Sequence, residues 1–177
     1  MLERVIAKLL KTNAFRSITG QIVPMIKVLF VCHGNICRSP MAEFIMKDMV
    51  VREGLCDKIY VESAATSREE IGNDMYPPAK RKLALEGIPF ERRRARQIKL
   101  QDYDEFDYII LMEEYNINNA MRIFREDPHG KLKLLLEFAG DRRDIADPWY
   151  TGNFDRTYND LVEGCRALLS FIKISAV

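Results

Sequence analysis

Cys32 and Arg38 stand six positions apart, and residues 28–40 around them read VLFVCHGNICRSP. The forked guanidinium of an arginine binds two phosphate oxygens at once. A thiol held in the positive field beside it readily becomes a thiolate, which is the nucleophilic form of cysteine. None of the other three cysteines has an arginine six residues later. The spacing therefore predicts an anion-binding loop that carries its own nucleophile.

The elements around this loop are suited to hold it. Residues 27–31 are mostly β-branched, aromatic or otherwise apolar, which is typical of a buried parallel strand, and Pro40 suits the first turn of a helix. Backbone N–H groups of a tight loop and of a helix N-terminus then face one anion, and Gly34 lets the backbone approach it. An inert buried cysteine is the alternative interpretation of Cys32, because free cysteines behave as small hydrophobes. The strand, loop and helix context favours the nucleophile.

The loop resembles that of the bacterial low-molecular-weight protein tyrosine phosphatases, which reads Cys-x-Gly-Asn-x-Cys-Arg-Ser-Pro and matches residues 32–40 at every fixed position. Residues 62–66, 106–116 and 147–150 resemble further family motifs in the expected order. The resemblance implies a phosphoric monoester hydrolase that needs no metal or cofactor and acts on phosphotyrosine. The reaction would pass through a cysteinyl-phosphate at Cys32, with Arg38 binding the phosphate oxygens.

Hydrolysis of a phosphorylated phenol requires a proton donor, because a phenolate whose conjugate acid has a pKa of about 10 leaves poorly at neutral pH. Two aspartates precede prolines, Asp127 and Asp147. The first lies in a turn-like stretch before the strand-like residues 132–136, as many Asp-Pro pairs do. Asp147 is instead followed by Trp149 and Tyr150, whose rings are large enough to flank a substrate ring. Chemistry favours Asp147 as the general acid, and the resemblance assigns it that role.

The resemblance also implies supporting roles around the nucleophile. Ser39 would donate a hydrogen bond to the thiolate, Asn35 would hold the strained loop, and Ser63 would support them from behind. Ordinary turn and cap chemistry is the alternative, since a serine directly before a proline is also a good helix N-cap. His33 stands where the family often carries an apolar residue, and we interpret it as a pocket wall or specificity position and not as a base. The residues expected to bind phosphate or substrate are His33, Gly34, Asn35, Ile36, Cys37, Ser39, Trp149 and Tyr150.

Cys37 lies inside the same loop and has two interpretations. As a second thiol it would capture an oxidised Cys32 in a disulfide, which protects the nucleophile from irreversible oxidation and makes the enzyme redox-sensitive. As a small apolar side chain it would only fill space. The sequence favours neither interpretation.

Ile36 bears on the substrate. Relatives that act on phosphoarginine carry a small hydroxyl residue at this loop position, so an apolar residue favours phosphotyrosine. A phosphoarginine phosphatase and a thioredoxin-coupled arsenate reductase are the alternatives, but the reductases use two further downstream cysteines on a mobile segment. Only Cys56 and Cys165 follow here, far apart. A non-catalytic phosphate-binding or redox-sensor module is a third alternative, and the complete catalytic set counts against it.

Strand-like and helix-like segments alternate along the chain, which predicts an α/β fold. The strand-like segments are residues 27–31, 58–63, 108–112 and 131–136, and the helix-like segments are residues 40–53, 78–86, 116–124 and 155–174. We expect three layers, with a four-stranded parallel sheet flanked by helices on both faces and the phosphate loop after the first strand. Residues 25–177 form one domain in this interpretation.

Composition limits the partners and cofactors. A net charge of +1, with 30% charged and 47% hydrophobic residues, is typical of a globular domain and gives no strong field for nucleic acid. Two histidines and no paired-cysteine spacing predict no metal site. Four cysteines without a secretory apolar segment favour a cytoplasmic location over a disulfide framework. The expected partners are phosphotyrosine-containing proteins, and we expect a monomer or weak dimer.

Residues 1–24 lie outside the resemblance, and we expect an N-terminal extension that is either helical or disordered. A helix there would be basic and amphipathic, and its apolar face would consist of Leu2, Val5, Ile6, Leu9 and Leu10. The apolar runs are too short for a membrane span. A dispensable extension before a start at Met25, a helix packed on the domain and a membrane anchor are the competing interpretations.

A second basic segment lies at residues 92–96, which read RRRAR. Such a run predicts a solvated face, with docking of a phosphoprotein as the less favoured alternative. The family has a related Arg-Gln element before its third strand, so the resemblance implies that some of these arginines are structural.

Overall fold

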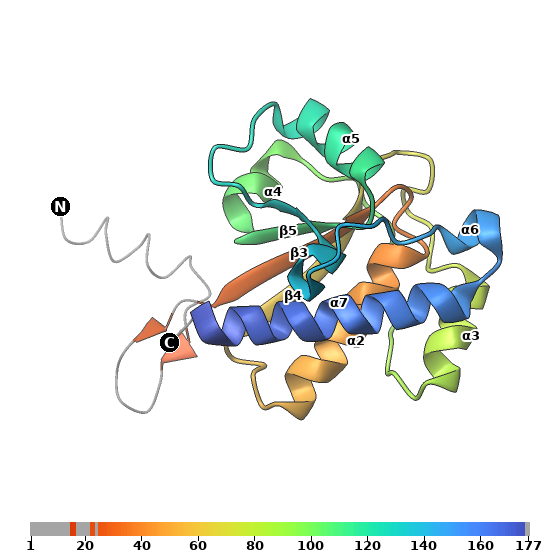
Figure 1. Cartoon of the computed structure of the whole chain (residues 1–177), viewed down its shortest axis with the longest axis horizontal. Helices are drawn as coiled ribbons and strands as arrows, with labels where there is room; N and C mark the ends of the chain where they lie inside the picture. Colours follow the sequence, from red (N-terminus) through yellow and green to blue (C-terminus); the bar gives the residue numbers. More distant parts are fainter. Residues whose placement is uncertain (1–14, 17–21, 24, 176–177) are drawn as a thin grey trace.

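The computed structural model describes residues 15–16, 22–23 and 25–175, and its main body is a layered α/β fold (Figure 1). Four parallel strands form the central sheet in the order β4-β3-β5-β6. Their bounds are β3 (Ile26–Cys32), β4 (Ile59–Ala65), β5 (Tyr108–Leu111) and β6 (Leu132–Leu134). This arrangement confirms the predicted four-stranded parallel sheet.

Helices cover both faces of the sheet, and Figure 1 shows α4 and α5 above it and α2 and α7 below it. The helices on the lower side are α2 (Arg38–Arg52), α3 (Pro77–Leu85) and α7 (Phe154–Ser175). Those on the upper side are α4 (Leu100–Glu105) and α5 (Glu114–Phe124). A 3-10 segment, η1 (Leu135–Ala139), follows β6, and the short α6 (Pro148–Thr151) precedes α7. The predicted three layers are confirmed.

The side chains of β3 alternate between two cores, as in a strand that is buried on both faces. Val28, Phe30 and Cys32 pack in the cluster that contains α2 and α7. Leu29 and Val31 pack in the cluster on the side of α4 and α5. Because β3 pairs with β4 on one side and with β5 on the other, its carboxyl end, which carries Cys32, is held in place by both neighbours.

The structure differs from the sequence-based prediction at the end of the last strand and in a short helix. The predicted strand 131–136 ends at Leu134, where the chain turns into η1 and buries Leu135 and Leu136 as helical residues. Short apolar runs do not distinguish a strand from a buried helical turn. The prediction also misses α4, whose six residues are too few to show a helical period.

Part of the predicted N-terminal extension forms strands. β1 (Phe15–Arg16) pairs antiparallel with β2 (Ile22–Val23). The rest of residues 1–24, including the predicted apolar helix face, lies outside the described residues. Among the helices that the structure describes, none is both long enough and apolar enough to cross a bilayer.

Candidate active site

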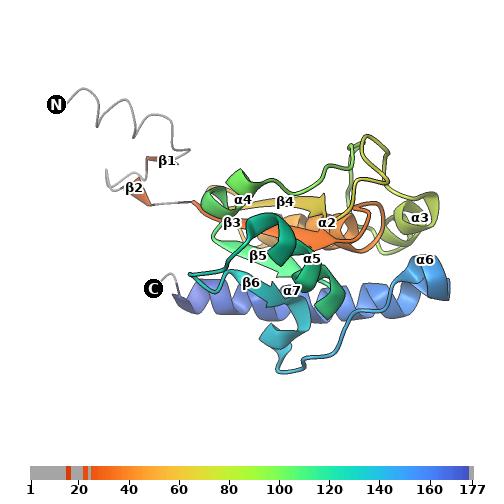
Figure 2. The same cartoon turned by 90° about the horizontal axis from the view of Figure 1, so that it is seen from above.

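Cys32 ends strand β3, and the loop of residues 33–37 turns around its side chain. Figure 2 shows α3 and α6 at this same end of the sheet. The Sγ atom accepts a hydrogen bond from the backbone N–H of Asn35 at 3.3 Å and lies 3.1 Å from Ser39 Oγ. The side chain is almost fully buried. These contacts suit a thiolate, which is a hydrogen-bond acceptor, at the base of an anion-binding loop.

Asn35 holds the loop from inside the protein. Its φ of 59° lies in the left-handed region, which asparagine tolerates better than most residues. Its side-chain amide donates to Ser39 Oγ at 2.9 Å and to Ser63 Oγ at 2.8 Å. The structure therefore brings together the three expected supporting residues from the loop, from α2 and from β4.

Arg38 is the first residue of α2 and is 1% exposed. Its Nη2 donates to Glu113 Oε1 at 2.9 Å and to Asp147 Oδ2 at 2.6 Å, and its Nη1 donates to the carbonyl of Ile145 at 3.0 Å. Burial alone would lower the pKa of this guanidinium, but the Cys32 thiolate, Glu113 and Asp147 raise it. Its buried Nε has no hydrogen-bond partner among the described residues.

Asp147 is the N-cap of α6, whose first residue is Pro148. Its Oδ1 accepts from the N–H of Trp149 at 3.0 Å, whereas its Oδ2 faces Arg38. A proline at the first helical position has no N–H to satisfy and presets the helical backbone. The Asp-Pro pair thus points one carboxylate oxygen into the site. The carboxylate of Asp127 accepts from the backbone of the turn before β6 instead.

One cavity of about 200 Å³ joins these groups. Trp149 and Tyr150 form part of its wall, where the indole packs on Tyr76 with ring centroids 4.8 Å apart and the Tyr150 ring is largely exposed. The lining residues are Cys32, His33, Gly34, Ile36, Cys37, Arg38, Glu69, Glu70, Asp147, Trp149 and Tyr150. Asn35 and Ser39, which we expected to touch phosphate or substrate, are buried behind this wall because their side chains bond to each other.

The chain is similar to known proteins over most of its length. Residues 27–176 match the model of a family described as low molecular weight phosphotyrosine protein phosphatase. The low molecular weight protein-tyrosine-phosphatase YfkJ of Bacillus subtilis is 44% identical over 153 residues, which cover 84% of this chain and 97% of YfkJ. The crystal structure of YfkJ has a TM-score of 0.82 at 42% identity and covers 85% of this chain and 96% of its own. The structure of DARP, a Drosophila arginine phosphatase, has a TM-score of 0.76 at 33% identity, with coverages of 84% and 98%.

The chain belongs to the low molecular weight phosphotyrosine protein phosphatase family. The match includes the phosphate loop, α2 and the Asp147 segment, so the resemblance first seen in separate motifs holds along the whole domain. Within the residues that the structure describes, no group of three or more His, Cys, Asp or Glu side chains is placed to hold a metal ion.

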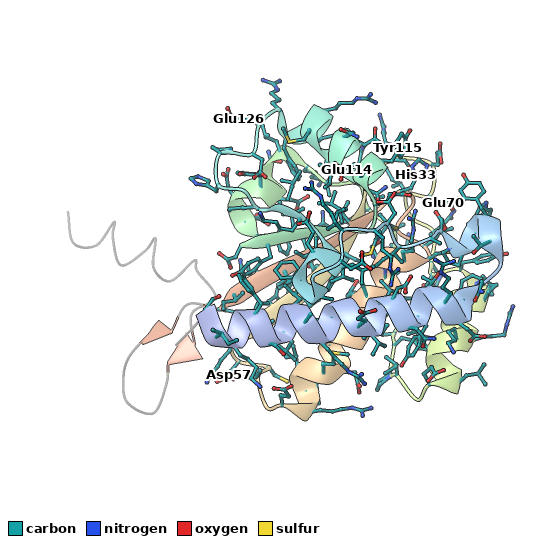
Figure 3. All side chains as sticks on the ribbon, viewed as in Figure 1. His33, Asp57, Glu70, Glu114, Tyr115 and Glu126 are labelled. Atoms are coloured by element: carbon teal, nitrogen blue, oxygen red, sulfur yellow. The ribbon has the colours of Figure 1, made fainter. Side chains whose placement is uncertain are left out.

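Two further carboxylates line the cavity of the phosphatase, and the sequence-based prediction did not include them. Glu69 and Glu70 lie in the loop between β4 and α3. Glu69 Oε2 lies 2.9 Å from His33 Nε2, and the His33 ring lies 6.4 Å from the ring of Tyr115. Figure 3 shows His33, Glu70 and Tyr115 at one end of the molecule. His33 therefore lies in the pocket wall and pairs with a residue that no local sequence signal connects to it.

Cys37 lines the same cavity as Cys32 and is buried. Burial raises the pKa of the Cys37 thiol, and the charges of Cys32 and Asp147 raise it further, against a lowering effect of Arg38. Cys37 is therefore held in its neutral thiol form.

The basic run of residues 92–96 divides into two pairs. Arg92 and Arg94 are exposed, as a solvated run predicts. Arg93 and Arg96 turn toward the domain and form ion pairs with its carboxylates. Half of the run is therefore structural, which the sequence left open.

The cavity loop of residues 66–76 is held at its end by Asp74. The Asp74 carboxylate accepts from the backbone N–H of Met75 at 2.8 Å and of Arg93 at 3.2 Å, and it pairs with Lys80. Burial alone would raise the pKa of Asp74, but the hydrogen bonds from Lys80, Met75 and Arg93 hold it below its usual value. The ionised carboxylate therefore stabilises the folded state.

Asp74→Asn should lower the free energy of unfolding at neutral pH by about 1 kcal/mol. Because the folded-state pKa is depressed, this contribution is complete above the unfolded pKa of about 4 and is lost as the pH falls through the folded-state value. Urea unfolding of both proteins from neutral to acid pH measures the difference, and the two stabilities should converge at acid pH. A difference that stays constant with pH contradicts the assignment. Asp57→Asn, at an exposed aspartate, is the control and should change stability by less than about 0.5 kcal/mol.

Proposed function

We propose that this phosphatase hydrolyses phosphotyrosine in proteins through a cysteinyl-phosphate intermediate on Cys32. The observation that carries the proposal is a single cavity lined by the thiol, the buried guanidinium and the carboxylate of Asp147. Displacement at phosphorus requires a nucleophile, donors around the equatorial oxygens and an acid beside the leaving group. The three groups are close enough to share one phosphate, because Arg38 contacts Asp147 directly and heads the helix that follows the loop.

In the first step the Cys32 thiolate attacks phosphorus, and the bond between phosphorus and the tyrosine oxygen breaks. Asp147 in its acid form gives its proton to that oxygen, which leaves as a neutral phenol. Arg38 and the loop N–H groups bind the equatorial oxygens and stabilise their charge. The step yields cysteinyl-phosphate, a tyrosine side chain and the carboxylate of Asp147.

In the second step a water molecule attacks the phosphorus of the cysteinyl-phosphate. The Asp147 carboxylate removes a proton from this water, so it acts as a base after acting as an acid. The bond between sulfur and phosphorus breaks, and Cys32 returns to the thiolate. Ser39, at 3.1 Å from Sγ, stabilises this leaving thiolate by a hydrogen bond.

The pair of Arg38 and Asp147 indicates how the acid becomes available. Their contact of 2.6 Å holds the carboxylate against Nη2 of the guanidinium. A phosphate dianion in the loop competes for the same donor, which releases Asp147 to take up a proton and face the leaving oxygen. Glu113 remains as a partner of the guanidinium during this exchange, so the buried cation stays compensated.

The walls of the cavity support a phosphorylated phenol as the substrate. Trp149 and Tyr150 supply ring faces, and Ile36 supplies an apolar surface beside the loop. A phosphoarginine is the second candidate substrate, because DARP is named an arginine phosphatase and because Glu69 and Glu70 at the cavity suit a guanidinium. Ile36 favours the phenol, which is less polar than a guanidinium.

An arsenate reductase and a module without catalysis have less support than a hydrolase. A reductase of the thioredoxin-coupled type relays electrons through cysteines on a mobile segment. Cys165 is fully buried within helix α7, where such a movement would require the helix to leave the core. A phosphate-binding or redox-sensor module would not need the Asp147 carboxylate next to the guanidinium.

The proposed partners are phosphotyrosine-containing proteins of the cytoplasm, and the proposed state is a monomer or weak dimer. All four cysteines are free, including the nucleophile. A free thiolate nucleophile works in a reducing compartment, which supports the proposed location. Cell fractionation and sedimentation of the purified chain test the location and the oligomeric state.

The proposed function is tested with phosphotyrosine, phosphoserine and phosphoarginine peptides, using wild type and Cys32→Ser without added metal. Wild type should release phosphate from phosphotyrosine, and Cys32→Ser should lose this activity by at least about 1,000-fold because it lacks the thiolate. Release from phosphoarginine in preference to phosphotyrosine would move the assignment to the second candidate. No release from any peptide would contradict the hydrolase.

Asp147→Asn should lower kcat by about 100-fold or more for phenyl phosphate, whose leaving group needs a proton. The loss should be much smaller for p-nitrophenyl phosphate, because p-nitrophenolate leaves without one. Asparagine is also a good N-cap, so α6 should persist, and thermal unfolding checks this. Steady-state kinetics with both esters measures the ratio of the two losses. Equal losses would exclude proton donation by Asp147.

Cys37 is proposed to protect the nucleophile. Hydrogen peroxide converts the Cys32 thiolate to a sulfenic acid, and the Cys37 thiol then forms the disulfide with loss of water. Peroxide-treated wild type should lose two hydrogens in mass and recover its activity with dithiothreitol, whereas Cys37→Ala should remain inactive as a sulfinic acid. Recovery of the variant to the same extent as wild type would leave Cys37 with a packing role only.

A further inference from the structure

Arg93 lies behind the phosphate loop, outside the cavity, and it has no part in the chemistry described above. We propose that Arg93 is a positioning residue that orients the side-chain amide of Asn35 and thereby makes Ser39 a hydrogen-bond donor to the Cys32 thiolate. The inference rests on the proposed function only in so far as Cys32 is the nucleophile. Arg93 would act on the ionisation of the Cys32 thiol before any substrate binds.

The Arg93 guanidinium is inserted between the phosphate loop and strand β4. Its Nη1 donates to the carbonyl of Asn35 at 2.8 Å, and its Nη2 donates to Asn35 Oδ1 at 2.7 Å and to Ser63 Oγ at 3.0 Å. Its Nε lies 3.6 Å from Glu43 Oε2, and its side chain is 11% exposed. One guanidinium thus binds both the backbone and the side chain of the residue with left-handed φ.

These contacts determine which end of the Asn35 amide faces which neighbour. A guanidinium has only donors, so the Asn35 atom that faces Arg93 must be the oxygen. The backbone N–H of Arg96 donates to the same oxygen at 3.2 Å. The NH₂ end of the amide therefore points away from Arg93, toward Ser39 and Ser63.

The orientation of the amide then determines the protons of both serines. Ser63 Oγ accepts from Asn35 and Arg93, so its own proton goes to Glu43 Oε2 at 2.6 Å. Ser39 Oγ accepts from Asn35, so its own proton is free to be donated. Its acceptors are Cys32 Sγ at 3.1 Å and the carbonyl of Ala64 at 3.2 Å. A thiolate is the stronger acceptor because it is charged.

Without Arg93 the Asn35 amide loses the hydrogen bond that holds its oxygen away from Ser39. If the amide turned over, its oxygen would face Ser39 and would accept the proton that now serves Cys32. The hydrogen bond of 3.2 Å from the Arg96 backbone N–H to Asn35 Oδ1 would then be the remaining contact from the basic run that restrains the amide. The positive charge of Arg93 acts in the same direction, because a cation near the loop favours the thiolate over the thiol. Burial lowers the pKa of this arginine, and the charges of Glu43 and Cys32 oppose that effect.

Arg93 is itself held by the cavity loop. Its backbone N–H donates to Asp74, and the neighbouring Ala95 exchanges backbone hydrogen bonds with Asn73 and Gly72 at 2.7 and 2.8 Å. The loop after β4 and the loop after β3 are therefore connected through one arginine. This connection explains why Arg93 turns inward while Arg92 and Arg94 remain in solvent.

The test uses Arg93→Met, which removes the charge and the donors at similar volume, and Arg93→Lys, which keeps the charge without the fork. Both are made in a Cys56→Ser background, so that the exposed thiol does not react. The rate of Cys32 alkylation by iodoacetamide is measured against pH, with mass spectrometry to locate the adduct. Arg94→Met, at the exposed neighbour, is the matched control.

Arg93→Met should shift the pH midpoint of alkylation upward by about one unit, and below that midpoint kcat/KM for p-nitrophenyl phosphate should fall about tenfold. Arg93→Lys should show a smaller upward shift, and Arg94→Met none. An unchanged midpoint in folded Arg93→Met overturns the proposal, whatever happens to turnover. If Arg93→Met fails to fold, the midpoint of Arg93→Lys decides by the same criterion. Alkylation needs no turnover, so the result is independent of whether phosphotyrosine is the substrate.

Discussion

The buried guanidinium of Arg38 is the charge on which the rest of this site depends. A cation removed from water is stable only when its partners compensate it. Here the partners are Glu113 and Asp147, which lie 75 and 109 residues further along the chain. The proposed general acid, Asp147, and the loop that carries Cys32 are therefore joined by the charge of Arg38. A phosphate dianion enters the same arrangement as one more partner of the guanidinium.

The phosphate loop also depends on a backbone conformation that it would not adopt alone. A residue other than glycine in the left-handed region costs about 1 kcal/mol or more. Hydrogen bonds to a charged group contribute about 1.5–3 kcal/mol each when they are buried. Arg93 makes such bonds to the carbonyl and the side chain of Asn35, so the contacts outweigh the strain. The loop can therefore hold its N–H groups around an anion before one binds, which lowers the cost of reorganisation during catalysis.

Four segments of the chain build the site, and three of them follow neighbouring strands of the sheet. The loop after β3 carries Cys32, the loop after β4 carries Glu69 and Glu70, and the segment after β5 carries Glu113, which contacts Arg38. The fourth segment lies between η1 and α7 and carries Asp147, Trp149 and Tyr150. Parallel strands place their carboxyl ends at one edge, so these loops meet without any long connection. β3 lies between β4 and β5, so Cys32 ends an inner strand of the sheet, and the loops after the neighbouring strands lie around it.

Part of this architecture could be predicted because its causes are local. The loop of residues 32–40 and the Asp-Pro pair at Asp147 depend on residues within one turn, and the alternation of apolar segments is enough to predict the parallel sheet. No local signal in the sequence connects Glu113 with Arg38, and Arg93 looked like one member of a solvated run. The sequence by itself determined the anion-binding loop with its cysteine and arginine and the strand and helix that flank it, since neighbouring residues impose these. Only the tertiary structure decided which carboxylates compensate Arg38 and which arginine orients Asn35, because packing alone brings together side chains that stand dozens of residues apart.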